Sequence, residues 1–417
     1  MKVLIALYDY FPNHSANTIC TKYIIDAMLK KDIEVHIACV KSDPTTESFE
    51  NKDGVFVHSI GLREDSFARK LRSRQGKVWI YPKAFLSKYY EHFSFYGNCG
   101  YTRSFQNHRV IETMERVIDE FEIDTLLSVS YPFSTHEACK ILKVKKPYLK
   151  WVCYELDPFT FNYTLPDRQC EHRKTRELMC FLHADFIIST LGINEYNEQK
   201  GFRLEYRDKT LSVPLPGLVV KNSISKDLSI LEKNGGKINL IYTGQFYGSL
   251  RSPVPLLKLL DNDASNNIVF HIIGGIIGSD ALVGGKCVIK EYPRSSVEVC
   301  DSSIADADVA INLDNKIPNQ APSKILSYMA LGVPIVNFHY KGCEIGESYL
   351  KNYESHLSIC VDDVEKENTI KSFYDFVNTY GKHWDNKRIA NIDCSLENDS
   401  VCEKIIDCIC NTGNIWF

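Results

Sequence analysis

Short apolar segments alternate with amphipathic segments along this chain, from residue 3 to residue 375. Apolar runs of roughly four to eight residues are typical of strands that are buried on both faces of a parallel sheet. Helical periodicity lies between them, as in 17–30, where Ile24, Ile25 and Met28 share one face. The pattern predicts two series of strands: 3–7, 35–40, 125–130, 148–154, 186–190 and 211–215, then 238–244, 267–275, 286–292, 308–313, 334–340 and 357–363.

Two such series predict an α/β protein with two doubly wound, Rossmann-like domains that face a central cleft. The length of 417 residues supports this division, because one hydrophobic core seldom serves more than about 300 residues. The polar stretch 219–236, which contains glycine, predicts a linker between an N-terminal domain, 1–218, and a C-terminal domain, 237–385. The final segment, 386–417, contains a helix that we expect to pack back on the N-terminal domain.

The overall charge gives no sign of a nucleic-acid partner or of a membrane protein. The net charge is −4 and the sequence pI is near 6.3. The 15 cysteines are scattered and form no Cys-x-x-Cys pair, which favours buried, reduced thiols. The sequence shows no signal peptide and no apolar stretch near the length of about 18 residues that spans a bilayer. We therefore expect a cytoplasmic protein.

One segment, 63–88, has a strong local charge. It carries eight Lys or Arg against two acidic residues, with Trp79, Tyr81 and Phe85 interleaved. This composition suits peripheral contact with the inner face of a membrane. A solvated loop and helix fit the same composition equally well, so the sequence leaves both interpretations open.

The first candidate site is the segment 242–260. The sequence predicts a strand that ends at Gly244, a loop, Arg251, and a helix over 252–263 with Ser252 as N-cap and Pro253 as its first residue. Free amides at a helix N-terminus and a guanidinium group both favour a diphosphate. An ordinary turn with a solvated arginine is the alternative interpretation.

The second candidate site is the segment 319–338. Pro322 opens a predicted helix that Gly332 closes, over 322–332. Ser323 and Lys324 lie in its first turn, where a hydroxyl, backbone amides and an ammonium group are available to a ligand. The alternative is a purely structural crossover helix with its apolar side chains in the core.

The sequence also argues against other ligands. Asp306 and Asp308 form an Asp-x-Asp pair, but they precede a predicted strand, so we expect a helix end and a strand entry instead of a metal site. The glycines of 274–285 do not follow the Gly-x-Gly-x-x-Gly pattern of a dinucleotide site. No Gly-Lys-Ser/Thr phosphate loop is present. We therefore predict no metal and no bound cofactor.

The segments 244–253 (GQFYGSLRSP) and 322–338 (PSKILSYMALGVPIVNF) resemble the donor half of the family-four GT-B glycosyltransferases. The segment 128–159 is similar to an N-terminal stretch of that family, so the likeness covers nearly the whole chain. The resemblance implies transfer of a hexose-type sugar from a nucleotide diphosphate-sugar, with retention and without metal. It also implies a glycan or lipid-linked acceptor, in surface polysaccharide synthesis.

The resemblance also assigns site residues. Asp157, Arg251 and Lys324 would be catalytic. Acceptor-side contacts would come from Asp157, His136, and His14 and Asn17 of the first loop. The donor contacts would be Gly244, Gln245, Arg251, Gly274, Gly275, Tyr292, Arg294, Asn319, Ser323, Lys324 and Ser327.

The sequence departs from the family at two of these positions. The family carries two acidic residues eight positions apart, whereas Asn319 and Ser327 stand here. An amide and a hydroxyl bind a ribose more weakly than ionised carboxylates do. Two alternatives therefore remain beside the transferase: a nucleotide-sugar 2-epimerase on the same fold, and a catalytically inactive partner or scaffold subunit.

Overall fold

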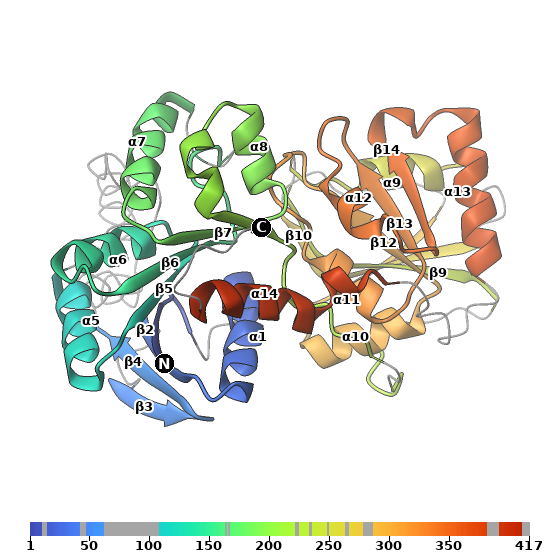
Figure 1. The fold of residues 1–417 in the computed structure, drawn as a ribbon. Coiled ribbons are helices and arrows are strands. Elements are labelled where there is room, and N and C mark those ends of the chain that lie inside the picture. Colours follow the sequence, from blue (N-terminus) through green and yellow to red (C-terminus); the bar gives the residue numbers. More distant parts are fainter. Residues whose placement is uncertain are drawn as a thin grey trace, which may run out of the picture. The chain divides into compact units, whose positions relative to one another are not determined.

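The computed structural model describes residues 1–10, 15–41, 47–61, 108–162, 165, 167–221, 225–232, 236–247, 250–262, 267–277, 287–381 and 392–410. The chain forms two compact units. The first contains Met1–Pro214 and Val401–Phe417, and the second contains Leu215–Ser400. Each unit is built on one sheet against which helices pack (Figure 1). The predicted α/β class with two doubly wound, Rossmann-like sheets is confirmed.

The first unit holds an eight-stranded sheet with the order β3-β4-β2-β1-β5-β6-β7-β8. All neighbouring strands run parallel except β3 and β4, which pair antiparallel at one edge. Each strand predicted for this unit is present, while β3 and β4 were not predicted. The strands are β1 (Lys2–Ala6), β2 (Glu34–Val40), β3 (Phe49–Lys52), β4 (Val55–Ile60), β5 (Thr125–Ser130), β6 (Lys150–Glu155), β7 (Phe186–Thr190) and β8 (Thr210–Val213).

Helices of the first unit bury their apolar faces against this sheet. The first helix is capped by Ser15, whose Oγ accepts a hydrogen bond from the Thr18 amide at 3.1 Å. Aromatic and aliphatic side chains such as Trp151, Phe133 and Met114 fill the core. The helices are α1 (Ala16–Lys30), α5 (His108–Phe121), α6 (Ser134–Lys145), α7 (Cys170–Phe181), α8 (Ile193–Gln199) and α14 (Asn398–Cys410).

The C-terminal helix α14 belongs to the first unit although it follows the second in sequence (Figure 1). Val401, Ile405 and Ile409 are fully buried on one of its faces. Lys31, at the end of α1, forms an ion pair with Glu403 at 3.3 Å. The first unit takes the chain from Val401 onward, later than the expected boundary at residue 386.

The second unit holds a six-stranded, fully parallel sheet with the order β11-β10-β9-β12-β13-β14. The predicted strands of this unit are all present. Two of them continue beyond the glycines at which we expected them to end. The strands are β9 (Ile238–Tyr247), β10 (Ile268–Ile277), β11 (Val288–Tyr292), β12 (Val309–Leu313), β13 (Ile335–His339) and β14 (His356–Cys360).

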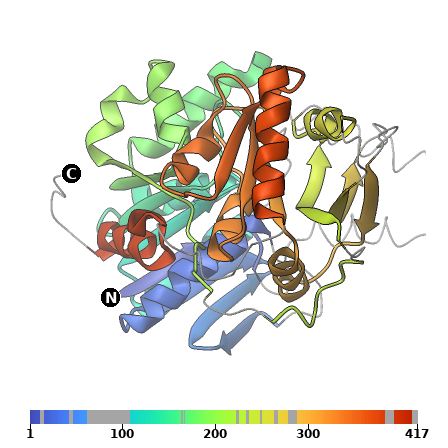
Figure 2. The ribbon, with the colours of Figure 1, turned by 90° about the vertical axis from the view of Figure 1, so that its right-hand side faces the viewer.

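The helices of the second unit include two that are shorter than predicted. The helix expected over 252–263 covers seven residues, with Pro253 as its N-cap, and the one expected over 322–332 also covers seven. Gly332 follows the second of them with φ +66°, as predicted for a C′ glycine. The helices are α9 (Val254–Leu260), α10 (Val297–Asp306), α11 (Lys324–Ala330), α12 (Ile345–Leu350) and α13 (Glu367–Tyr380), which lies along the sheet (Figure 2).

The expected linker, 219–236, is part of the second unit where the structure describes it. The Ser229 hydroxyl donates to Asp306 at 2.8 Å, and the Ile230 amide donates to the Ser303 hydroxyl at 3.2 Å. The Lys290 ammonium donates to the Glu232 carbonyl at 2.6 Å. This segment is therefore attached to α10 and β11 by its own hydrogen bonds.

Candidate functional site

The strand order of the second sheet marks one position for a ligand. From β9 the chain passes outward to β10 and β11, and then crosses to β12 on the other side of β9. At such a switch point, the loops after the two central strands diverge and leave a crevice at their carboxyl ends. The loops after β9 and β12 therefore form the candidate donor site.

Arg251 and Asn315 meet at this switch point. Arg251 follows β9, and Asn315 follows β12. The Asn315 Oδ1 atom accepts hydrogen bonds from Arg251 Nη2 at 2.6 Å and from Nε at 3.1 Å. The Arg251 side chain is half-buried and makes no ion pair with any residue that the structure describes. A cation is thus fixed in orientation while its charge stays uncompensated by the described part of the chain.

The loop after β12 is held on both sides of Asn315. Its neighbour Lys316 donates its backbone amide to the Leu250 carbonyl at 2.9 Å. Asp314 is fully buried and accepts hydrogen bonds from the Gly346 amide at 3.1 Å and from Asn312 at 3.0 Å. Burial raises the pKa of Asp314 to about 7. These contacts set the position of the loop that carries Asn315.

The glycines of the predicted donor site lie within paired strands. Gly244 and Gly274 are opposite each other in β9 and β10, and Gln245 is opposite Gly275. All three glycines have positive φ angles between 116° and 141°. The prediction that β9 ends at Gly244 is wrong, because the strand pairing continues to Tyr247. The structure thus brings Gly244, Gln245, Gly274 and Gly275 together beside the switch point.

Helix α11 approaches the same site. The Tyr328 hydroxyl is buried and accepts a hydrogen bond from the Thr243 amide of β9 at 3.0 Å. Burial raises the pKa of Tyr328. The hydrogen bond ties α11 to β9, the strand that precedes Arg251.

The remaining predicted residues of 319–338 differ in exposure. Ser323 is exposed, and Lys324 and Ser327 are half-buried on α11. Lys324 has no ion-pair partner in the part of the chain that the structure describes. Asn319 is 1% exposed, which leaves its side chain little surface for a ligand.

Tyr292 and Arg294 lie away from the switch point: Tyr292 is the last residue of the edge strand β11, and Arg294 follows it. The Tyr292 hydroxyl accepts a hydrogen bond from the Glu232 amide at 2.9 Å and also contacts His271 Nδ1 at 3.1 Å. Arg294 is exposed. Tyr292 therefore supports the attachment of the segment that contains Glu232.

The first unit has its own switch point between β1 and β5. Asn17, the second residue of α1, donates to the Tyr131 carbonyl after β5 at 3.0 Å. Ser15, and not Asn17, is the N-cap of this helix. Asp157 follows β6 and is half-buried. His14 lies outside the described residues.

His136 is a correction to the predicted acceptor-side residues. Its side chain is 0% exposed, and Nδ1 is 2.6 Å from the Ser128 hydroxyl, which also accepts from Trp151 Nε1 at 2.8 Å. Burial lowers the pKa of His136 to about 3, so the ring is neutral. His136 is a core residue, because α6 turns this face toward the sheet.

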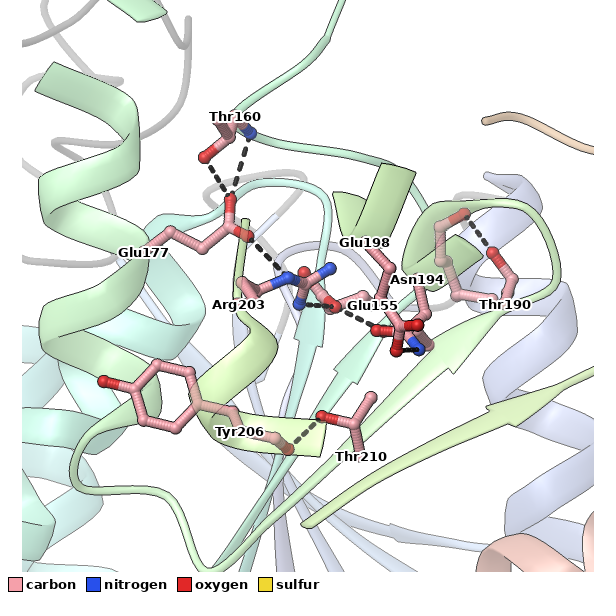
Figure 3. Close-up of polar contacts among 11 residues, drawn as sticks. Glu155, Thr160, Glu177, Thr190, Asn194, Glu198, Arg203, Tyr206 and Thr210 are labelled. Carbon is pink, nitrogen blue, oxygen red and sulfur yellow. Dashed lines mark hydrogen bonds and ion pairs between the residues drawn. The ribbon is translucent and has the colours of Figure 1, made fainter. Parts of the chain in front are cut away.

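A buried charged cluster in the first unit was not predicted. Arg203 Nη1 donates to Glu155 Oε2 at 2.7 Å, and Arg203 Nε is 3.4 Å from Glu177 Oε1 (Figure 3). Glu177 in turn accepts two hydrogen bonds from Thr160. Burial raises the pKa of Glu177 to about 7, while the charge of Arg203 opposes that shift. The cluster joins the end of β6, α7 and the segment before β8.

The structure places the Asp-x-Asp pair of the second unit. Asp306 ends α10, and Asp308 precedes β12 and accepts from the Asn239 amide at 2.7 Å, so the expected helix end and strand entry are confirmed. Among the described residues, no group of three His, Cys, Asp or Glu could hold a metal, and no helix is long and apolar enough to cross a bilayer. The basic segment 63–88 lies outside the described residues.

No protein-family model and no curated protein sequence matches this chain. Solved structures match it over nearly its whole length. Sucrose-phosphate synthase from Thermosynechococcus elongatus is 12% identical with a TM-score of 0.63, and the match covers 97% of each chain. The apo form of the lipopolysaccharide outer core galactosyltransferase WaaB is 11% identical with a TM-score of 0.59, over 98% of this chain and 99% of that one.

A third similar structure is "Trehalose-6-phosphate from E. coli bound with UDP-2-fluoro glucose". It is 9% identical with a TM-score of 0.56, and the match covers 97% of this chain and 95% of that one. At such identities, the likeness establishes the architecture and leaves the activity to the site residues. The chain has the two-domain GT-B fold, the fold of these solved glycosyltransferase structures.

Proposed function

We propose that this chain is a glycosyltransferase of the hexosyltransferase type, which uses a nucleotide diphosphate-sugar as donor. The observation that carries the proposal is the Arg251 guanidinium, which a neutral amide holds at the switch point of the second sheet. An uncompensated, oriented guanidinium suits two phosphate groups. The GT-B fold supports the proposal, as does the UDP-2-fluoro glucose in one similar structure.

In this proposal, Arg251 and Lys324 contact the donor diphosphate. Transfer breaks the bond between the sugar C1 atom and the diphosphate, whose oxygen takes the electron pair. Two cations near that oxygen stabilise the charge that develops as it leaves. Ser323 and Ser327 offer hydroxyls to the donor from α11, and the backbone of Gly244, Gly274 and Gly275 lies beside it. We assign Gln245 and Asn319 less direct roles around this site, and Tyr292 and Arg294, which lie on the edge strand and after it, roles farther from the diphosphate.

We further propose that transfer retains the configuration at C1 and needs neither metal nor cofactor. With two cations at the leaving group, the acceptor hydroxyl can attack from the face that the diphosphate leaves. The hydroxyl proton then passes to the departing phosphate oxygen, and the new bond joins the acceptor oxygen to C1. Asp157 and Asn17 of the first unit would contact a glycan or lipid-linked glycan acceptor, in surface polysaccharide synthesis.

A product assay tests this function. The chain is incubated with UDP-, GDP-, ADP- and dTDP-hexoses in EDTA, with and without a mixture of glycan acceptors, and products are separated by chromatography. We expect a nucleoside diphosphate to be released, more quickly when an acceptor is present. Loss of activity in EDTA that manganese or magnesium restores would contradict the metal-free mechanism.

The same assay separates the alternatives. A 2-epimerase would convert the nucleotide sugar into its epimer without any acceptor. An inactive partner or scaffold subunit would release nothing. One observation favours that last alternative: Asn319 is buried and Ser327 is neutral, at the two positions where the sequence resemblance implies acidic residues.

A further inference from the structure

We propose that Asn315 is a positioning residue that orients Arg251 for a phosphate group without neutralising it. This inference rests on the function proposed above. None of the sequence motifs described above includes Asn315. Its only sequence signal is its place two residues beyond the end of a buried strand.

The geometry constrains the guanidinium plane. Two donors of Arg251, Nε and Nη2, share one acceptor, Asn315 Oδ1, at 3.1 and 2.6 Å. A guanidinium has five N–H donors in one plane, so two bonds to a single atom fix the direction of the others. No residue that the structure describes accepts a hydrogen bond from Nη1. These remaining donors are available to phosphate oxygens.

The orientation of the Asn315 amide is itself determined. Asn315 Nδ2 is 3.2 Å from the Gln320 carbonyl oxygen and 3.3 Å from Gln320 Oε1, and both of these are acceptors. The amide nitrogen must therefore face Gln320, and the amide oxygen must face Arg251. Asn315 is 3% exposed, so its side chain has few other rotamers open to it.

The choice of an amide has an electrostatic consequence. Two other arginines with restricted exposure are paired with carboxylates: Arg203 with Glu155, and Arg176 with both oxygens of Glu137. Such pairs neutralise the guanidinium. An asparagine oxygen accepts the same hydrogen bonds but carries no net charge. Asn315 therefore keeps the full positive charge of Arg251 for an anion.

The inference is tested with Asn315→Asp, Asn315→Ala, Arg251→Ala and the two double variants in the full chain. Asn315→Asp is nearly isosteric and adds a carboxylate beside Arg251. Asn262→Asp is the matched control. Asn262 is exposed beyond the end of α9, so the substitution adds the same negative charge elsewhere in the second unit. The probes are UDP, ADP, GDP, dTDP and inorganic pyrophosphate, titrated calorimetrically in EDTA. Melting temperatures are measured on the same samples.

We expect Asn315→Asp to weaken binding of the tightest probe by about tenfold or more, because it removes a charge-assisted contact. Asn315→Ala should weaken binding by roughly threefold to tenfold through lost orientation. With Arg251→Ala already present, Asn315→Ala should alter affinity by no more than about twofold, because the two residues act through one contact. In the same background, Asn315→Asp should weaken binding further, because its carboxylate then repels the diphosphate without a cation beside it. Asn262→Asp should bind as the wild type does.

Other results would overturn the inference. If folded Asn315→Asp binds the probe as tightly as wild type, Asn315 does not control the charge of Arg251. If Asn315→Ala weakens binding equally with and without Arg251, its role is only structural. If Asn315→Ala does not fold, the nucleotide affinity of Asn315→Asp alone tests the inference. If the wild type binds none of the probes, the proposed function itself fails, and the positioning role with it.

Discussion

Gly244 and Gly274 lie opposite each other in β9 and β10, so close that a Cβ atom on Gly274 would be 2.1 Å from the Gly244 carbonyl oxygen. Gly274 has φ +139°, a backbone angle that residues with a Cβ atom rarely adopt. Only glycine at this position allows the two strands to continue past the switch point. The close approach explains why both strands extend beyond the glycines at which the sequence pattern predicted their ends.

Gly274→Ala should therefore destabilise the protein by about 3 kcal/mol or more, since it combines backbone strain with a steric clash. Gly275→Ala is the control. Gly275 has φ +116°, but a Cβ atom added to it would have no atom within 4 Å. Gly275→Ala should therefore lower the free energy of unfolding by the backbone strain alone, about 1–2 kcal/mol. Urea unfolding of both variants measures the difference. Equal losses would mean that the approach of the two strands is not tight.

Arg203→Met should destabilise the first unit by about 3–5 kcal/mol, because it leaves Glu155 and Glu177 buried without a cation. Arg207→Met, four residues later, provides the comparison. Arg207 pairs with Glu198 with 61% of its side chain exposed, so its loss should cost less than about 1 kcal/mol. Chemical denaturation of both variants gives the two free energies. A loss at Arg203 no larger than that at Arg207 would show that the cluster is not desolvated.

Asp314 should make stability depend on pH. Its pKa is about 7 in the folded chain because of burial, with Glu347 adding to the shift, and its ordinary value is 3.8. A carboxyl whose folded pKa is raised favours the fold while it is protonated, so this contribution is lost as pH rises from about 4 to about 7. Relative to wild type, Asp314→Asn should gain up to about 4 kcal/mol of unfolding free energy across that range. A difference that does not change with pH would contradict the assignment.

Much of the fold could be predicted because buried parallel strands have continuous apolar sequences. The segments that became β1, β5, β9 and β12 are of this kind. β3 was missed because its sequence, Phe49–Lys52, is short, mostly exposed and polar, as an antiparallel edge strand can be. Its pairing with β4 depends on contacts along the sheet that a local pattern does not contain.

The site could be predicted only in part. Arg251 and Lys324 were predicted from their places at the starts of predicted helices, and their roles stay predictions. Asn315 was not, because its role depends on the crossover that brings the loop after β12 beside the loop after β9. His136 was misjudged for the opposite reason. Its sequence position predicted a helix but not which face of that helix meets the sheet.

Ser327→Glu tests whether the present pocket is a weakened donor site. Ser327 is half-buried on α11, one turn after Ser323, at a position where the sequence resemblance implies an acidic residue. An ionised acceptor for ribose hydroxyls should tighten nucleotide binding by about 1–2 kcal/mol, after the cost of ordering the side chain.

The two outcomes of Ser327→Glu are separated by measuring nucleotide affinity and melting temperature on the same samples. If the pocket is closed, the new carboxylate is buried without a partner and lowers the melting temperature. A lower melting temperature, with no nucleotide binding in either protein, would favour the inactive scaffold over the transferase.

The most direct measurement is calorimetric titration of UDP, ADP, GDP and dTDP into wild type, Arg251→Ala and Lys258→Ala, all in EDTA. Lys258 is a matched control, because it is an exposed cation on α9 that pairs with Glu365 at 3.1 Å. The account predicts that at least one diphosphate binds wild type and Lys258→Ala alike. Arg251→Ala should weaken that binding roughly 10- to 100-fold, the loss of about 1.5–3 kcal/mol expected for a charge-assisted contact. If no diphosphate binds wild type, or if Arg251→Ala binds as tightly as wild type, the donor site is not at Arg251.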